Sequence, residues 1–118
     1  MTRRVRIGVI GVGALGWHHA RHLAAHGGVE LVGVYDIRTD RAQDVAAAFG
    51  TTAFPTREAL LSRVECVVVA VPTVSHADVG LAVLEAGVAI FVEKPLASTL
   101  TEADQLVAAV DATGLVMQ

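Results

Sequence analysis

The sequence is poor in several residue types, and each shortage excludes a class of protein. Its 118 residues include one cysteine, three prolines and only 4% aromatic residues. A single cysteine cannot form an internal disulfide, so the chain does not read as a disulfide-stabilised secreted domain, and we expect a reducing, cytoplasmic location. The net charge of −3 argues against the basic surface that binding to nucleic acid or to anionic lipid requires. The partners we expect are therefore small molecules, with no nucleic acid and no membrane.

Long apolar runs are also missing. No uninterrupted run approaches the roughly 18 residues of a membrane span. The N-terminal segment "MTRRVRIGVIGVGALG" places basic residues before an apolar stretch, as a signal peptide does, but four glycines interrupt it and no small-residue cleavage motif follows directly. We therefore expect a soluble chain whose length suits one domain with its own core.

Segments of strand length alternate with segments of helical period along the whole chain. This alternation predicts an α/β fold with a doubly wound parallel sheet of about six strands, covered by helices on both faces. Glycines at 50, 87 and 114 stand where helix ends favour a left-handed residue, and "TLTE" at 99–102 matches a capping box. The expected strands are 5–10, 30–36, 51–54, 66–71, 89–93 and one from 115, and the expected helices are 14–26, 40–49, 57–62, 75–86 and 100–112.

A glycine pattern follows the first expected strand. The segment "GVGALG" matches G-x-G-x-x-G and lies between the strand-like "VRIGVI" and a helix-like segment. In this pattern Gly11 forms the tight turn, Gly13 lets the backbone approach a pyrophosphate, and Gly16 lets the helix pack close to the sheet. The first amides of the helix, those of Ala14 and Leu15, then face the phosphates. The pattern in this context predicts a dinucleotide-binding (Rossmann) fold.

An acid stands at the end of the second expected strand, where such folds bind the adenosine ribose. Asp36 there accepts hydrogen bonds from the ribose hydroxyls and repels a 2′-phosphate, which favours NAD over NADP. Arg38, two residues later, has the reach to contact a 2′-phosphate or to stack on adenine, so NADP stays possible. The alternative is that Arg38 is only a solvated surface residue. A methyltransferase of the same architecture also has a Gly-rich first loop and an acid after its second strand, so these signals alone leave that class open.

Two further segments, "VPTVSH" and "EKP", follow the fourth and fifth expected strands and should line the same crevice. The second contains Lys94, the only lysine in the chain. A lysine amine can lose its proton when desolvated, whereas an arginine guanidinium stays charged. Pro95 restricts Lys94 to an extended backbone, which directs the amine into the crevice. Lys94 is therefore the expected catalytic residue. The alternative is that it only pairs with a carboxylate or with the cofactor ribose, in which case arginine could replace it.

The segments "GVGALGWHHARHL", "VYDIRTDRAQDVAAAFG" and "AVPTVSHADVGLAVLEAGVAIFVEKPLA" resemble, in order and spacing, the N-terminal domain of the glucose-fructose oxidoreductase, inositol dehydrogenase and MocA-like family. The E-K-P triplet is the most specific element, and a methyltransferase has no reason to carry it. The resemblance covers nearly the whole chain. It implies NAD(P)-dependent hydride transfer to or from a sugar, a cyclitol or a related hydroxyl or carbonyl compound, with Lys94 near nicotinamide and substrate.

The resemblance also implies a second domain, absent from this sequence, that completes the substrate site and usually the interface of a homo-oligomer. Residues 1–118 are then one dinucleotide-binding domain at the N-terminal end of a longer protein. A non-catalytic dinucleotide sensor is the alternative function, because a fold does not determine an activity. The expected cofactor-binding residues are Gly11, Gly13, Ala14, Leu15, Gly16, Asp36, Arg38, Val71, Pro72, Thr73, His76 and Glu93.

Some positions keep more than one interpretation. Thr73 stands where the family often has Asn, which changes a hydrogen bond near the cofactor. His76 falls in the first turn of a helix after the expected N-cap Ser75, where the positive helix end favours a neutral imidazole. It can approach the nicotinamide ribose or only pack at the helix start. The histidines at 18, 22 and 26 recur at helical spacing, but no acid or cysteine accompanies them, so we expect a polar helix face and no metal site.

Overall fold

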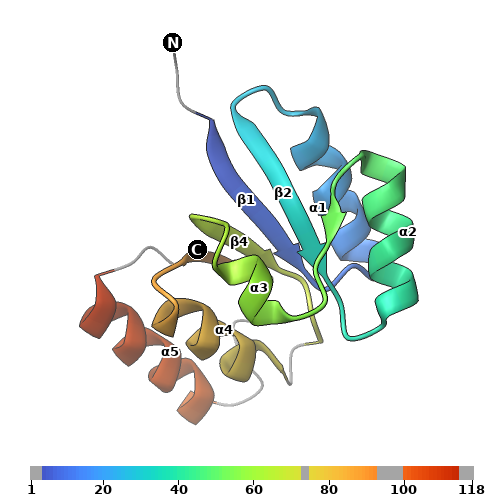
Figure 1. The fold of residues 1–118 in the computed structure, drawn as a ribbon. Coiled ribbons are helices and arrows are strands. Elements are labelled where there is room, and N and C mark those ends of the chain that lie inside the picture. Colours follow the sequence, from blue (N-terminus) through green and yellow to red (C-terminus); the bar gives the residue numbers. More distant parts are fainter. Residues whose placement is uncertain (1–3, 73–74, 93–99, 115–118) are drawn as a thin grey trace.

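The computed structural model describes residues 4–72, 75–92 and 100–114 (Figure 1). Strands and helices alternate along these residues, as the sequence pattern predicts. The strands are β1 (Val5–Ile10), β2 (Val29–Tyr35), β3 (Thr52–Ala53), β4 (Cys66–Val69) and β5 (Ala89–Val92). The helices are α1 (Ala14–Ala25), α2 (Thr39–Phe49), α3 (Arg57–Leu61), α4 (His76–Glu85) and α5 (Leu100–Thr113). The expected strand from residue 115 and the start of the expected capping box lie outside the described residues.

The strands form one parallel sheet in the order β3-β2-β1-β4-β5. The chain thus moves outward from β1 through β2 to β3, and then returns to place β4 and β5 on the other side of β1. The doubly wound arrangement is therefore confirmed. The strand order reverses between β1 and β4, and ligands of such sheets bind beyond the carboxyl ends of the strands at this point.

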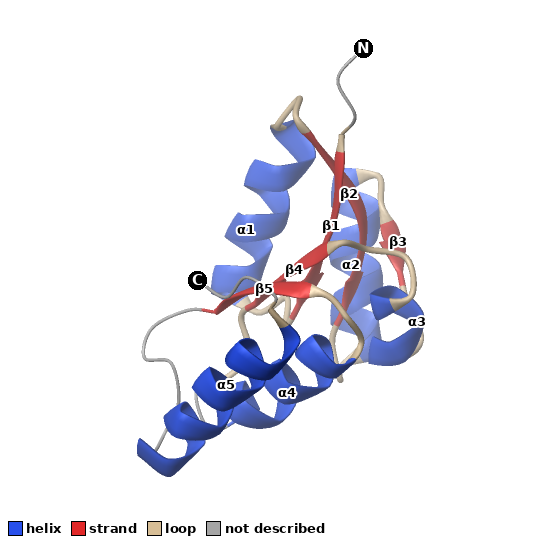
Figure 2. Cartoon of the chain, turned by 90° about the vertical axis from the view of Figure 1, so that its left-hand side faces the viewer, coloured by secondary structure: helices blue, strands red, loops and turns tan. Residues whose placement is uncertain are grey.

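Helices cover both faces of the sheet, as Figure 1 shows with α1 and α2 on one side and the group of α3, α4 and α5 on the other. In Figure 2, α4 and α5 lie against each other. Neighbouring residues of a strand serve opposite faces: Val9 packs with the α1 and α2 core, and Ile10 packs with the α3 and α4 core. Burial on both faces explains why the strands read as continuous apolar runs rather than alternating ones. No helix in the described part of the chain is long and apolar enough to cross a membrane.

Element ends depart from the sequence expectation by one or two residues, and one departure matters for function. We expected β4 to reach residue 71, but its pairing with β5 ends at Val69, opposite Val92. Ala70 still donates its amide to Ile10 at 2.8 Å. After it the chain leaves the sheet, which frees Val71 to line the ligand-binding edge. The three glycines expected at helix ends have left-handed φ angles of 67°, 79° and 70°.

Candidate cofactor-binding site

The loop between β1 and α1 is built on Gly11. Its φ of 91° lies in the left-handed region that favours glycine, and its amide donates to the carbonyl oxygen of Tyr35 at 2.8 Å. A Cβ atom at this position would lie 2.8 Å from the backbone of Ala70. Both the turn and the close approach of the β4 end therefore require glycine here.

The other two glycines of the motif differ in how closely other atoms surround them. A Cβ atom on Gly16 would collide with the carbonyl oxygen of Gly11, so α1 can lie this close to the loop only without a side chain. A Cβ atom on Gly13 would meet no atom within 4 Å, so this position borders open space. Gly13 is also the N-cap of α1 and has no side chain to bond the first amides of the helix. The amides that begin α1, those of Ala14 and Leu15, are thus the kind of unsatisfied donors that bind phosphate.

Asp36 fastens the glycine loop to the end of β2. Its Oδ2 accepts the amide of Val12 at 2.8 Å, and its Oδ1 accepts the amide of Arg38 at 2.8 Å. A carboxylate oxygen has two lone pairs, so each oxygen keeps the capacity to accept a further hydrogen bond. Asp36 is therefore both an anchor of the loop and an acceptor at the edge of the open space.

The chain beyond β4 forms the opposite side of the site. His76 is buried, with 1% of its surface exposed, and its Nε2 lies 2.9 Å from the carbonyl oxygen of Val71. Ser75 is the N-cap of α4 without a side-chain cap bond. Of the two interpretations of His76, this placement supports packing at the helix start, where the ring steadies the segment that carries Val71 and Pro72.

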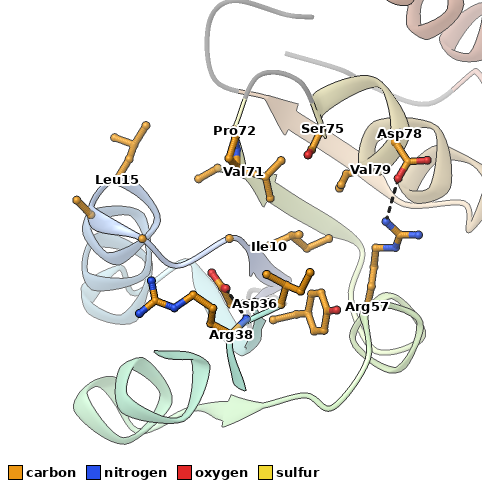
Figure 3. Close-up of a pocket in the computed structure, with 16 residues that line it drawn as sticks. Ile10, Leu15, Asp36, Arg38, Arg57, Val71, Pro72, Ser75, Asp78 and Val79 are labelled. Atoms are coloured by element: carbon orange, nitrogen blue, oxygen red, sulfur yellow. Dashed lines mark hydrogen bonds and ion pairs between the residues drawn. The ribbon is translucent and has the colours of Figure 1, made fainter. Parts of the chain in front are cut away.

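These elements surround a cleft of about 730 Å³ (Figure 3), within the range of small-molecule and cofactor sites. Its lining combines the glycine loop, the end of β2 and the start of α4. The expected residues that the structure brings together there are Gly11, Gly13, Ala14, Leu15, Asp36, Arg38, Val71 and Pro72. Gly16 and His76 do not line the cleft, but each contacts a residue that does, Gly16 the carbonyl of Gly11 and His76 the carbonyl of Val71. Thr73, Glu93 and Lys94 lie outside the described residues.

Several lining residues were missed by the sequence reasoning. Ile37 follows Asp36 and is 88% exposed, an unusual state for a large apolar side chain, and it forms an apolar wall of the cleft. An apolar residue between two charged ones at a strand end is the sequence signal that would have identified it. Arg57 of α3 and Asp78 of α4 form an ion pair of 3.8 Å at the rim (Figure 3). Their pairing depends on the tertiary packing of α3 and α4, so no local sequence pattern predicts it.

Two other groups of reactive side chains stay apart from the cleft. The histidines of α1 at 18 and 22, and His26 just after it, are exposed, and the described residues contain no group of three or more His, Cys, Asp or Glu able to hold a metal ion. Cys66 lies half-buried in β4. Burial, and then the neighbouring Glu65 carboxylate, raise the pKa of its thiol above the usual 9.0, so little reactive thiolate forms near neutral pH.

A glycine loop that opens a helix, an acid at the end of the second strand and a cleft at the reversal of strand order together define a dinucleotide-binding Rossmann domain. Residues 5–118 match the sequence model of GFO_IDH_MocA, described as an oxidoreductase family with an NAD-binding Rossmann fold. The chain belongs to this family.

Relatives and solved structures agree with this assignment. A UDP-N-acetylglucosamine 3-dehydrogenase of Acidithiobacillus ferrooxidans is 43% identical over 103 residues, covering 87% of this chain and 32% of the relative. An inositol 2-dehydrogenase of Saccharopolyspora erythraea is 40% identical over 113 residues, covering 93% and 33% respectively. The structure of GenD2 from gentamicin A biosynthesis, in complex with NAD, matches with a TM-score of 0.93 and 35% identity over 99% of this chain and 34% of that one. The chain thus spans about a third of the length of the relatives it matches.

Proposed function

We propose that this chain binds NAD in the cleft and is the cofactor domain of an oxidoreductase that transfers hydride between nicotinamide and a sugar, a cyclitol or a related hydroxyl or carbonyl compound. The observation that carries the proposal is the convergence of three groups on one cleft. The amides at the start of α1, the carboxylate of Asp36 and the apolar wall at Ile37 all line it. They suit the pyrophosphate, the ribose and the adenine of a dinucleotide respectively.

The residues present fit the cofactor. Open space beside Gly13 leaves room for phosphate oxygens at the start of α1, where the positive end of the helix favours negative charge. Asp36 keeps acceptor capacity for ribose hydroxyls although both of its oxygens already bond backbone amides. The nicotinamide of a bound NAD supplies the hydride chemistry, while the protein binds and orients it.

We propose that NAD is preferred to NADP. A 2′-phosphate on the adenosine ribose would lie against the Asp36 carboxylate, and like charges repel. Arg38 lines the same part of the cleft and would attract that phosphate. The anchoring of Asp36 to two backbone amides holds its charge in place, which supports its dominance over a long, flexible arginine side chain.

The substrate class follows from the relatives, whose names specify a nucleotide sugar and inositol. Because this chain spans about a third of their length, we propose that it is the N-terminal cofactor domain of a longer protein whose second domain completes the substrate site. We also propose that the longer protein is a homo-oligomer, as the family resemblance implies, and cytoplasmic, as the single cysteine suggests. We further propose that Lys94 exchanges a proton with the reacting oxygen of the substrate, and that Thr73 and Glu93 contribute to the cofactor site.

Titration of the 118-residue chain with NADH and NADPH tests the proposal. Trp17, the only tryptophan, lies in the first turns of α1 and packs against Phe49 with ring centroids 5.3 Å apart. Reduced nicotinamide absorbs where tryptophan emits, so bound NADH should lower the emission in a saturable way and at lower concentration than NADPH. Absence of saturable quenching by either nucleotide, with circular dichroism confirming the fold, would overturn the proposal. Tighter binding of NADPH would overturn the preference for NAD.

A further inference from the structure

The peptide groups around Val12 are held by two side chains. Val12 is fully buried, and its amide donates to Oδ2 of Asp36 at 2.8 Å. Its carbonyl oxygen accepts Nε of Arg41 at 2.6 Å. Arg41 belongs to α2 and is not among the described residues that line the cleft. The glycine loop is therefore held at both backbone groups of Val12, its amide by Asp36 at the end of β2 and its carbonyl by Arg41 on α2.

The bond to the carbonyl has a consequence one residue further along. The carbonyl of Val12 and the amide of Gly13 belong to the same planar peptide group, in which C=O and N–H point in opposite directions. Fixing the carbonyl against Arg41 therefore also fixes the direction of the Gly13 N–H. That amide stands at the N-cap of α1, beside the open space of the cleft.

Without the hydrogen bond from Arg41, the Val12–Gly13 peptide group would have unusual freedom to rotate. Its rotation changes ψ of Val12 and φ of Gly13, and glycine accepts φ values that other residues reject. The bond to Asp36 holds the preceding peptide group, that of Gly11 and Val12, and leaves the next one unrestrained. Arg41 is the side chain that completes the restraint.

Arg41 also occupies a place that helix electrostatics do not favour. It is the third residue of α2, which begins at Thr39, and the N-terminal turn of a helix is the positive end of its dipole. A cation is disfavoured there unless another interaction compensates. The short, charge-assisted bond to the Val12 carbonyl supplies one.

We infer that Arg41 is a positioning residue for the dinucleotide: its Nε orients the Val12–Gly13 peptide group so that the Gly13 amide faces the phosphates. The inference rests on the proposed function, because it assigns a role in the same cleft. Arg41 acts through the hydrogen bond and not through its charge. A direct attraction between guanidinium and phosphate is the competing explanation, and the two differ in which substitutions preserve binding.

Arg41→Gln and Arg41→Met separate these explanations. Glutamine places its Nε2 the same number of bonds from Cα as the arginine Nε, so it retains a donor without the charge. Methionine has similar length and neither donor nor charge. Arg63→Met is a matched control, because Arg63 is exposed just before β4, at the opposite edge of the sheet from the cleft.

We expect NADH to bind Arg41→Met about tenfold more weakly than the parent chain, the scale of one lost charge-assisted hydrogen bond, and to bind Arg41→Gln within about threefold. Arg63→Met should bind as the parent does. Parent-like affinity in Arg41→Met would overturn the inference. Equal losses of NADH affinity in Arg41→Gln and Arg41→Met would also overturn the inference, and would support a direct attraction between the guanidinium charge and the phosphates.

Amide hydrogen exchange in the free chain gives a readout that does not depend on the cofactor. In Arg41→Met the amide of Val12, which donates to Asp36, should exchange at least about tenfold faster, whereas the amide of Val67 in the centre of β4 should keep its rate. Equal acceleration at Val67 would reveal a general loss of stability and contradict a positioning role. If the parent chain binds no NADH, the proposed function is wrong, while this measurement still decides whether Arg41 restrains the loop.

Discussion

Two glycines of one loop should respond in opposite ways to the same substitution. Gly13→Ala adds a methyl group where no protein atom lies within 4 Å, and Gly16→Ala adds one that collides with the Gly11 carbonyl oxygen. The first change should leave the fold intact and obstruct the cofactor. The second should disturb the fold itself, because α1 must move away from the loop to accommodate it.

The structure sets the magnitudes. Gly13 has φ −65° and ψ −162°, an extended conformation that alanine adopts, so its replacement should change stability by less than about 1 kcal/mol. The methyl group borders the space where phosphate must approach the amides of α1, and loss of one charge-assisted hydrogen bond there corresponds to about tenfold weaker NADH binding. Overpacking at Gly16 should cost about 1–3 kcal/mol, which lowers the Tm of a domain of this size by about 4–12 °C.

Thermal unfolding followed by circular dichroism and calorimetric titration with NADH measure the two effects separately. Gly13→Ala should keep the parent Tm within a few degrees and lose affinity. Gly16→Ala should lose Tm even without ligand. The reasoning is refuted if Gly13→Ala binds NADH as tightly as the parent chain, or if Gly16→Ala unfolds at the parent temperature.

Two further predictions concern Asp36 and Lys94. Asp36→Asn removes the charge that opposes a 2′-phosphate and puts an amide donor where one backbone amide now donates. The affinity for NADH should therefore fall about tenfold, and the preference for NADH over NADPH should shrink. An unchanged preference in parallel titrations would assign the selectivity to other residues. Lys94→Arg and Lys94→Met, made in a protein that includes a substrate domain, should leave NAD affinity within about tenfold and slow hydride transfer about a hundredfold or more in stopped-flow reduction of NAD, as loss of one acid/base group does. Hydride transfer at the wild-type rate in Lys94→Arg would refute the proposed catalytic role of Lys94.

The glycine loop and its acid could be predicted from the sequence because a recurring motif restricts their residue types and their spacing. Gly11 needs a left-handed φ, Gly16 needs a bare Cα, and Asp36 needs only its place at a strand end. Each requirement restricts one residue type at one spacing, so the pattern is visible without a structure. The same holds for the strands, since burial on both faces leaves continuous apolar runs.

The remaining features depend on contacts between distant segments. The run "CVVVAV" gives no sign that β4 ends at Val69, because the residues that line the cleft afterwards are as apolar as those in the sheet. Arg41 reads as one more charged residue on an amphipathic helix, since its partner is a backbone carbonyl 29 residues away. Arg57 and Asp78 become a pair only when α3 and α4 pack at the same rim.

The central claim is that the dinucleotide binds where the glycine loop, Asp36 and the end of β4 meet. Titration of the isotope-labelled chain with NAD, followed by amide chemical shifts, tests it most directly. The largest shifts should fall on Gly13, Ala14, Leu15 and Arg38, with none at Gly28 or Arg63 at the other edge of the sheet. Shifts that avoid the glycine loop and gather instead around the second depression, lined by Glu58, Ser62 and Glu85 of the α3 and α4 surface, would contradict the account.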